Sequence, residues 1–87
     1  MNSLARFASL VEHRLSVSPE NGYYLTARAQ VALIELEVAQ EGRLSQATFA
    51  RLTLGVMCAR EVELIDMAFC EAAYAMLDEV RPADDRE

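Results

Sequence analysis

Apolar residues return at three- and four-residue steps along most of this 87-residue chain, and no stretch alternates with a period of two. The first spacing is that of one face of an α-helix, whereas a half-buried strand requires the second. The clearest stripe consists of Leu4, Phe7, Val11 and Leu15. We therefore expect an all-α fold that begins with a helix over about residues 3–15.

A second helix is expected in the middle of the chain, between two punctuation signals. Ser18-Pro19-Glu20 is typical of a helix start, with Gly22 delaying the regular turns to about Tyr23, and Gly42 is typical of a stop. One apolar row consists of Tyr24, Ala27, Val31, Ile34 and Val38; a second consists of Leu25, Ala29, Ala32, Leu36 and Ala39. Two apolar rows are typical of a helix in the middle of a bundle, with neighbours on both sides.

The third helical segment follows a serine cap at Ser45, and from there to Val80 only Gly55 interrupts the helical pattern. This predicts a long or Gly55-kinked C-terminal helix, about 50 Å long if fully continuous. Two shorter helices cannot cover that length, so we expect a homodimer of small bundles with three to four helices each. Residues 1–81 are predicted to form a single helical domain, and residues 82–87 a flexible acidic tail.

Charge is distributed unevenly along the chain. Residues 1–60 hold six arginines against five carboxylates, whereas residues 61–87 hold nine carboxylates against two arginines. The acidic segment is also rich in apolar residues, a combination that suits a basic protein surface better than nucleic acid. We therefore predict a partner-binding acidic face on the last helix, formed by Glu61, Glu63, Asp66, Glu71, Asp78 and Glu79.

One stretch favours a different function. Residues 44–56 contain a glutamine, Gln46, followed four positions later by an alanine, Ala50, and then by a Gly-Val pair, Gly55-Val56. This pattern resembles the first helix and turn of the bacterial helix-turn-helix family, which implies a DNA-binding regulator. The following residues 58–71 carry one cation and four carboxylates, which would repel phosphates. Direct nucleic-acid binding is therefore disfavoured, and a DNA-binding regulator is kept only as the alternative to a protein-binding module.

Residues that could perform chemistry are sparse. Glu61 and Glu63 would diverge by about 200° on a helix, so they do not form a catalytic or metal-binding pair. One histidine and two separated cysteines, Cys58 and Cys70, do not form a zinc motif, and both thiols are expected to be buried and reduced. We therefore expect no enzymatic activity, no cofactor and no metal.

The leading hypothesis is a small acidic inhibitor or regulator, of the antitoxin, immunity-protein or phage-blocker kind, that docks on a basic protein surface. A small structural subunit or chaperone of a larger complex is a further alternative. The first residues form no signal-peptide core, and no apolar run is long enough to span a bilayer. These features predict a soluble cytoplasmic protein.

Overall fold

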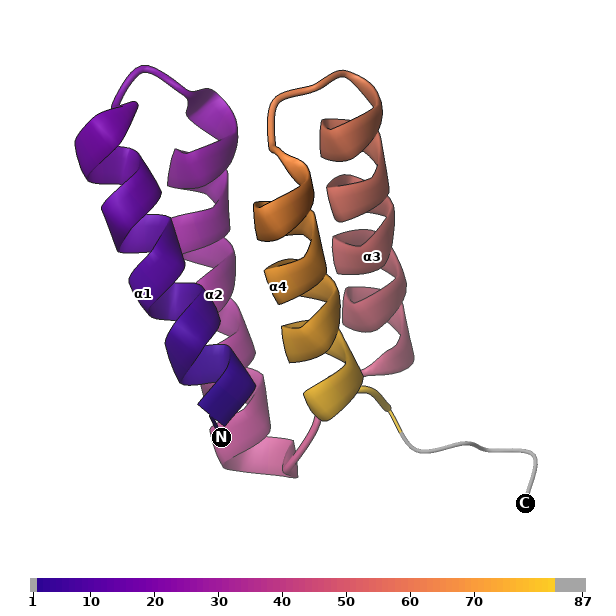
Figure 1. Ribbon diagram of the computed structural model, residues 1–87. Helices are drawn as coiled ribbons and strands as arrows, with labels where there is room; N and C mark the ends of the chain where they lie inside the picture. The colour runs from indigo at the N-terminus through magenta and orange to yellow at the C-terminus, as the bar shows by residue number, and fades with distance from the viewer. Residues whose placement is uncertain (1, 83–87) are drawn as a thin grey trace.

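The computed structural model of the chain describes residues 2–82, which form four helices and no strand. The helices are α1 (Asn2–Val17), α2 (Gly22–Glu41), α3 (Gln46–Glu61) and α4 (Met67–Glu79). They run alternately up and down as two hairpins, with the α1–α2 and α3–α4 turns at one end and the α2–α3 connection at the other (Figure 1). The predicted all-α bundle of three to four helices is confirmed. The expected tail lies almost entirely outside the described residues.

The core forms between the two hairpins, because α1 packs against both α2 and α4 and α3 packs against α4. Phe69 of α4 is fully buried at its centre. The Phe69 ring centroid lies 5.3 Å from that of Phe7 and 5.0 Å from that of Tyr24. The four residues of the predicted α1 stripe are all buried, as expected: Leu4, Phe7, Val11 and Leu15.

Helix α2 begins at Gly22, within one residue of the expected start at about Tyr23, but its cap is not the expected Ser18. Asn21 is the cap, and its side-chain oxygen accepts a hydrogen bond of 2.9 Å from the Tyr23 amide. Residues 18–20 form the turn after α1, in which the Ser18 carbonyl accepts from the Asn21 amide. Asparagine is as good a cap as serine, and the one nearer the apolar pattern is used here.

Only one of the two apolar rows of α2 is buried, so the expectation of neighbours on both sides is wrong for the single chain. Four members of the first row are buried and Val38 is half-buried, whereas every member of the second row is exposed. Leu25 and Leu36 keep 51% and 54% of their surface. The second row stays exposed because α2 packs closely against α1 and makes few direct contacts with α3.

The prediction of one long or Gly55-kinked C-terminal helix is also wrong. Helix α3 passes through Gly55 without a break and ends at Glu61, and α4 returns antiparallel to it (Figure 1). At this end the Glu63 amide bonds the Arg60 carbonyl and the Leu64 amide bonds the Ala59 carbonyl. Glu63 has a φ of 63°, the left-handed conformation of a Schellman stop. The dimer that we inferred from helix length therefore loses that reason, and dimerisation itself stays a prediction.

The connection at the opposite end agrees with the expected signals. Gly42 stops α2 with a φ of 82°, and its amide bonds the Val38 carbonyl at 2.8 Å. Ser45 caps α3 by accepting from the Thr48 amide at 3.2 Å. The Glu37 carboxylate holds this cap in place, since it accepts from both the Ser45 amide and the Thr48 hydroxyl.

Candidate partner-binding surface

The six carboxylates predicted to form one acidic face lie along the whole length of α4, from the α3–α4 turn to the far end of the helix. Glu61, Glu63 and Asp66 are at the α3–α4 turn, Glu71 is in the first half of α4, and Asp78 and Glu79 are at the far end of that helix. All six are exposed. The segment between Asp66 and Glu79 spans about 20 Å along the helix axis.

Three of these carboxylates make contacts within the chain. Glu79 accepts from the amides of Ser3 and Leu4, at 3.0 and 3.3 Å, and so supplies the first turn of α1 with an acceptor. Asp78 forms an exposed ion pair with Arg81 at 3.3 Å. Asp66 is the cap of α4. The other three, Glu61, Glu63 and Glu71, have no hydrogen-bond or ion-pair partner within residues 2–82.

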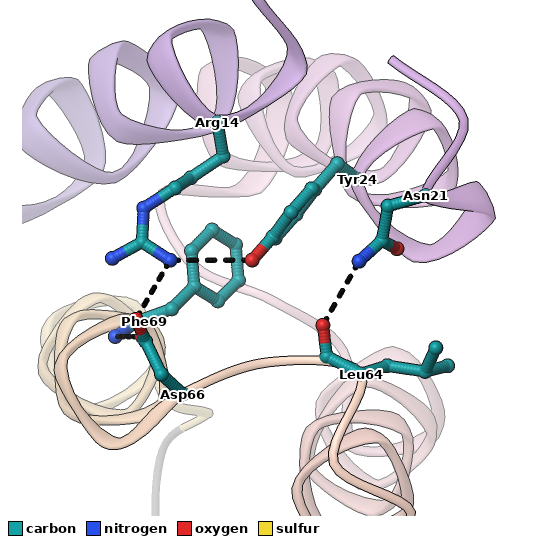
Figure 2. Close-up of polar contacts among 6 residues, drawn as sticks. All are labelled: Arg14, Asn21, Tyr24, Leu64, Asp66 and Phe69. Carbon is teal, nitrogen blue, oxygen red and sulfur yellow. Dashed lines mark hydrogen bonds and ion pairs between the residues drawn. The ribbon is translucent and has the colours of Figure 1, made fainter. Parts of the chain in front are cut away.

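Asp66 joins the two hairpins (Figure 2). One carboxylate oxygen accepts from the Phe69 amide at 2.9 Å, and the other lies 3.1 Å from Nη1 of Arg14 in α1. The same Arg14 nitrogen donates to the Tyr24 hydroxyl at 3.2 Å. The amide hydrogen bond, assisted by the guanidinium, holds the pKa of Asp66 below its ordinary value. Asp66 is therefore first a structural residue.

Asn21 makes a second link between the hairpins (Figure 2). Its side-chain nitrogen donates to the Leu64 carbonyl at 2.9 Å while its oxygen caps α2. The α1–α2 turn thus fixes the backbone of the α3–α4 turn. Sequence reasoning missed this role, because the Ser18-Pro19 signal indicates a helix start in place of Asn21. In addition, no local pattern indicates a hydrogen bond between residues 43 positions apart.

The apex of the α3–α4 turn combines apolar and acidic side chains. We define the turn surface as Glu61, Val62, Glu63, Leu64 and Met67. Its three apolar members keep 65%, 45% and 53% of their area exposed, in the order Val62, Leu64 and Met67. Its two carboxylates are exposed and without partners within residues 2–82. An apolar centre with charged neighbours is the pattern of a protein–protein interface.

Two hollows adjoin the turn surface. One, of about 430 Å³, lies against the α1–α2 turn and includes Ser18, Asn21, Glu63 and Leu64 in its lining. The other, of about 340 Å³, is an apolar groove between α2 and α3. Val62 and Leu64 line this groove, so the turn surface continues into it. A partner that contacts the apex would therefore find shaped surface on both sides.

Two sequence-based expectations, the helix-turn-helix resemblance and the burial of both cysteines, can be compared with the structure here. Gly55 and Val56 lie inside α3, so the turn implied by the helix-turn-helix resemblance is not formed. Cys70 is buried as expected, but Cys58 is exposed and the expectation of burial is wrong for it. Within residues 2–82, no group of three or more His, Cys, Asp or Glu side chains is arranged to hold a metal ion.

None of the four helices is both long enough and apolar enough to cross a membrane, as far as residues 2–82 are concerned.

Comparison with known proteins gives one result. The family model named Tsi6 matches residues 1–79, which is most of the chain, and Tsi denotes a type VI secretion immunity protein. No curated protein and no solved structure gives a significant match. An immunity family implies a toxin as protein partner. Because this match covers more than half of the chain, the chain belongs to the Tsi6 family.

Proposed function

We propose that this protein is a non-enzymatic immunity protein that neutralises its toxin by docking the turn surface on a basic region of that toxin. The observation that carries the proposal is the composition of the apex. Val62, Leu64 and Met67 are exposed beside two carboxylates, Glu61 and Glu63, that bind nothing else in residues 2–82. Family membership supports the toxin as the class of partner.

The free carboxylates are the residues best suited to the electrostatic part of this contact. Asp66, Asp78 and Glu79 each hold another part of the chain, so a toxin cation would compete with an existing contact. Glu61 and Glu63 have no such competition, and Glu71 lies one to two turns further along α4. We therefore reduce the predicted acidic face to these three residues as direct contacts. The other three add to the negative field that steers a basic partner.

The apolar members of the turn surface would supply the buried centre of the interface. Burial of exposed Val62, Leu64 and Met67 contributes about 25 cal/mol for each Å² removed from water, and carboxylates at the rim favour a cationic partner over a neutral one. The turn is fixed by Asn21 and Asp66, so little ordering would be needed on binding. Neutralisation would then be steric: the bound apex covers the basic region of the toxin.

The test requires the toxin, which can be captured from a lysate of the native host treated with nuclease, identified by mass spectrometry and then purified. Glu61→Arg is the test variant and Glu41→Arg its matched control, because each glutamate is exposed and is the last residue of its helix. We expect the first substitution to weaken toxin affinity at least about tenfold and the second to leave it unchanged. Affinity should also fall as salt is raised.

Isothermal titration calorimetry provides the affinities, and protection of cells that express the toxin provides the functional readout. Equal affinities for the Glu61→Arg and Glu41→Arg variants, with both correctly folded, would show that the toxin binds elsewhere. Recovery of nucleic acid alone, lost on nuclease treatment, would contradict a protein partner altogether.

A further inference from the structure

The exposed row of α2 continues beyond the five residues noted in the sequence, and nothing in residues 2–82 covers it. We define the outer strip as Gly22, Leu25, Ala29, Ala32, Leu36 and Ala39, all of which are exposed. They lie within about 100° of one another around the helix and opposite its buried row. Leu25 and Leu36 each keep more than half of their area, and no side chain or backbone atom approaches the missing Cβ of Gly22 within 4 Å.

The pattern of large and small residues in the outer strip is the same in both directions along the helix. Its centre lies midway between residues 30 and 31, so that Leu25 mirrors Leu36, Ala29 mirrors Ala32, and Gly22 mirrors Ala39. Large residues are therefore matched with large ones and small with small. When two copies of such a helix run antiparallel about a two-fold axis at that centre, each residue meets its mirror position on the other copy. The four small residues allow the two backbones to approach closely.

The charges beside the outer strip favour the same arrangement. Arg28 and Glu35 lie on one flank of the outer strip. In an antiparallel pair related by a two-fold axis, this flank of one helix lies on the same side of the interface as the same flank of the other helix. Arg28 of one copy would then lie about 3 Å along the axis from Glu35 of the other. Glu35 has no partner within residues 2–82, whereas Arg28 is held by Glu12 at 2.8 and 2.9 Å. A parallel two-fold pair would instead bring opposite flanks together and place Arg28 beside Thr26, which carries no charge.

From the mirror symmetry and the flanking charges we propose that the protein forms a symmetric homodimer through antiparallel contact of α2 with α2 of a second copy. Because the helices are antiparallel, the turn surfaces lie at opposite ends of the dimer and stay open. A dimer would therefore carry two toxin sites. The homodimer does not depend on the proposed function, since the outer strip and the turn surface share no residue.

Sedimentation velocity of the purified full chain over a range of concentrations tests the dimer. We expect a dimer that dissociates on dilution, as for a small interface. Leu36→Glu should raise its dissociation constant at least about tenfold, because it buries a carboxylate without a partner. Leu54→Glu is the matched control: Leu54 keeps 59% of its area, close to that of Leu36, but lies on α3. Circular dichroism verifies that both variants fold.

Cysteine cross-linking tests the direction of the pair, in a Cys58→Ser background that removes the exposed thiol. Leu25→Cys alone and Leu36→Cys alone should each give little cross-linked dimer on oxidation. An equal mixture of the two should give disulfide-linked dimers, because each new thiol meets its mirror position only in the other variant. Cross-linking of Leu25→Cys with itself would indicate a parallel pair and overturn the proposed geometry.

A monomer at every concentration would overturn the proposal, as would a dimer weakened by Leu54→Glu and not by Leu36→Glu. If the chain is monomeric and Leu36→Glu abolishes toxin binding, the outer strip belongs to the toxin interface instead. Loss of toxin binding with Glu61→Arg and an unchanged dimer would separate the two surfaces.

Discussion

Two helices of this protein end with a residue in the left-handed conformation, and they do so with different residues. Helix α2 ends at Gly42, with a φ of 82°, and α3 ends through Glu63, with a φ of 63°. Glycine adopts this conformation at no steric cost, whereas a residue with a Cβ pays about 1 kcal/mol or more. The same backbone device is thus unstrained at one end of the molecule and strained at the other.

The difference follows from what each turn does. Gly42 lies in a connection held by Glu37 and Ser45 and carries no side chain to present. Glu63 lies at the apex of the turn surface, where its exposed carboxylate has no partner within residues 2–82. Strain of this kind persists where neighbouring contacts determine the backbone, and here Asn21 and Asp66 supply those contacts. A costly residue at an exposed position is consistent with a role in binding.

The largest effect is expected from removing a contact that holds the strained turn. Asp66→Ala should lower the free energy of unfolding by about 1 to 2 kcal/mol, since it removes the cap of α4 and a partly exposed ion pair with Arg14. Urea denaturation measures the change. Asp66→Asn keeps a capping side chain and should lose less than half as much. Equal losses would show that the ion pair, rather than the cap, dominates.

Gly42→Ala should cost about 1 kcal/mol, because alanine must adopt the left-handed conformation there although no atom obstructs its Cβ. Gly55→Ala is the matched control. It lies inside α3, also with free space for a Cβ, and should stabilise by a similar amount. Thermal unfolding of the two variants should therefore move the midpoint in opposite directions. Movement in the same direction would contradict the conformational argument.

Glu63→Gly should stabilise the protein by about 0.5 kcal/mol, the relief of strain less the greater freedom of glycine in the unfolded chain. The same substitution should weaken toxin binding, because it removes a free carboxylate from the turn surface. Chemical denaturation and calorimetric titration separate the two effects. Higher stability with unchanged affinity would remove Glu63 from the proposed interface and leave its strain without a functional reason.

The smallest effect concerns acid stability. The folded-state pKa of Asp66 lies below its ordinary value, so its contribution is present above the unfolded-state pKa, about 3.9, and is lost as the pH falls below it. The difference in unfolding free energy between the wild type and Asp66→Asn should therefore narrow below about pH 4. A difference that stays constant down to pH 2 would contradict this.

The residues whose roles were predicted correctly from the sequence have roles that depend on near neighbours in the chain. The α1 stripe, the Gly42 stop and the Ser45 cap depend on neighbours within a few positions, where helix periodicity and capping rules apply. The break after Glu61 could not be predicted, because a glutamate in the left-handed conformation carries no sequence signal. The structural roles of Asp66 and Glu79 were also missed, since Glu79 contacts Ser3 across 76 residues. Sequence charge located the acidic segment but not the division between free and occupied carboxylates.

The hydrogen bonds from the Ser3 and Leu4 amides to Glu79 bring the beginning of α1 beside the end of α4, at the end of the bundle away from the turn surface (Figure 1). Adjacent ends of this kind permit circular permutation. A short glycine-rich peptide could join residue 82 to residue 2, and new ends could open in the turn at residues 18–20. Fusion partners or surface tethers attached near residue 2 or residue 82 would leave the apex facing outward, an arrangement suited to immobilised capture of a toxin that binds the turn surface as proposed.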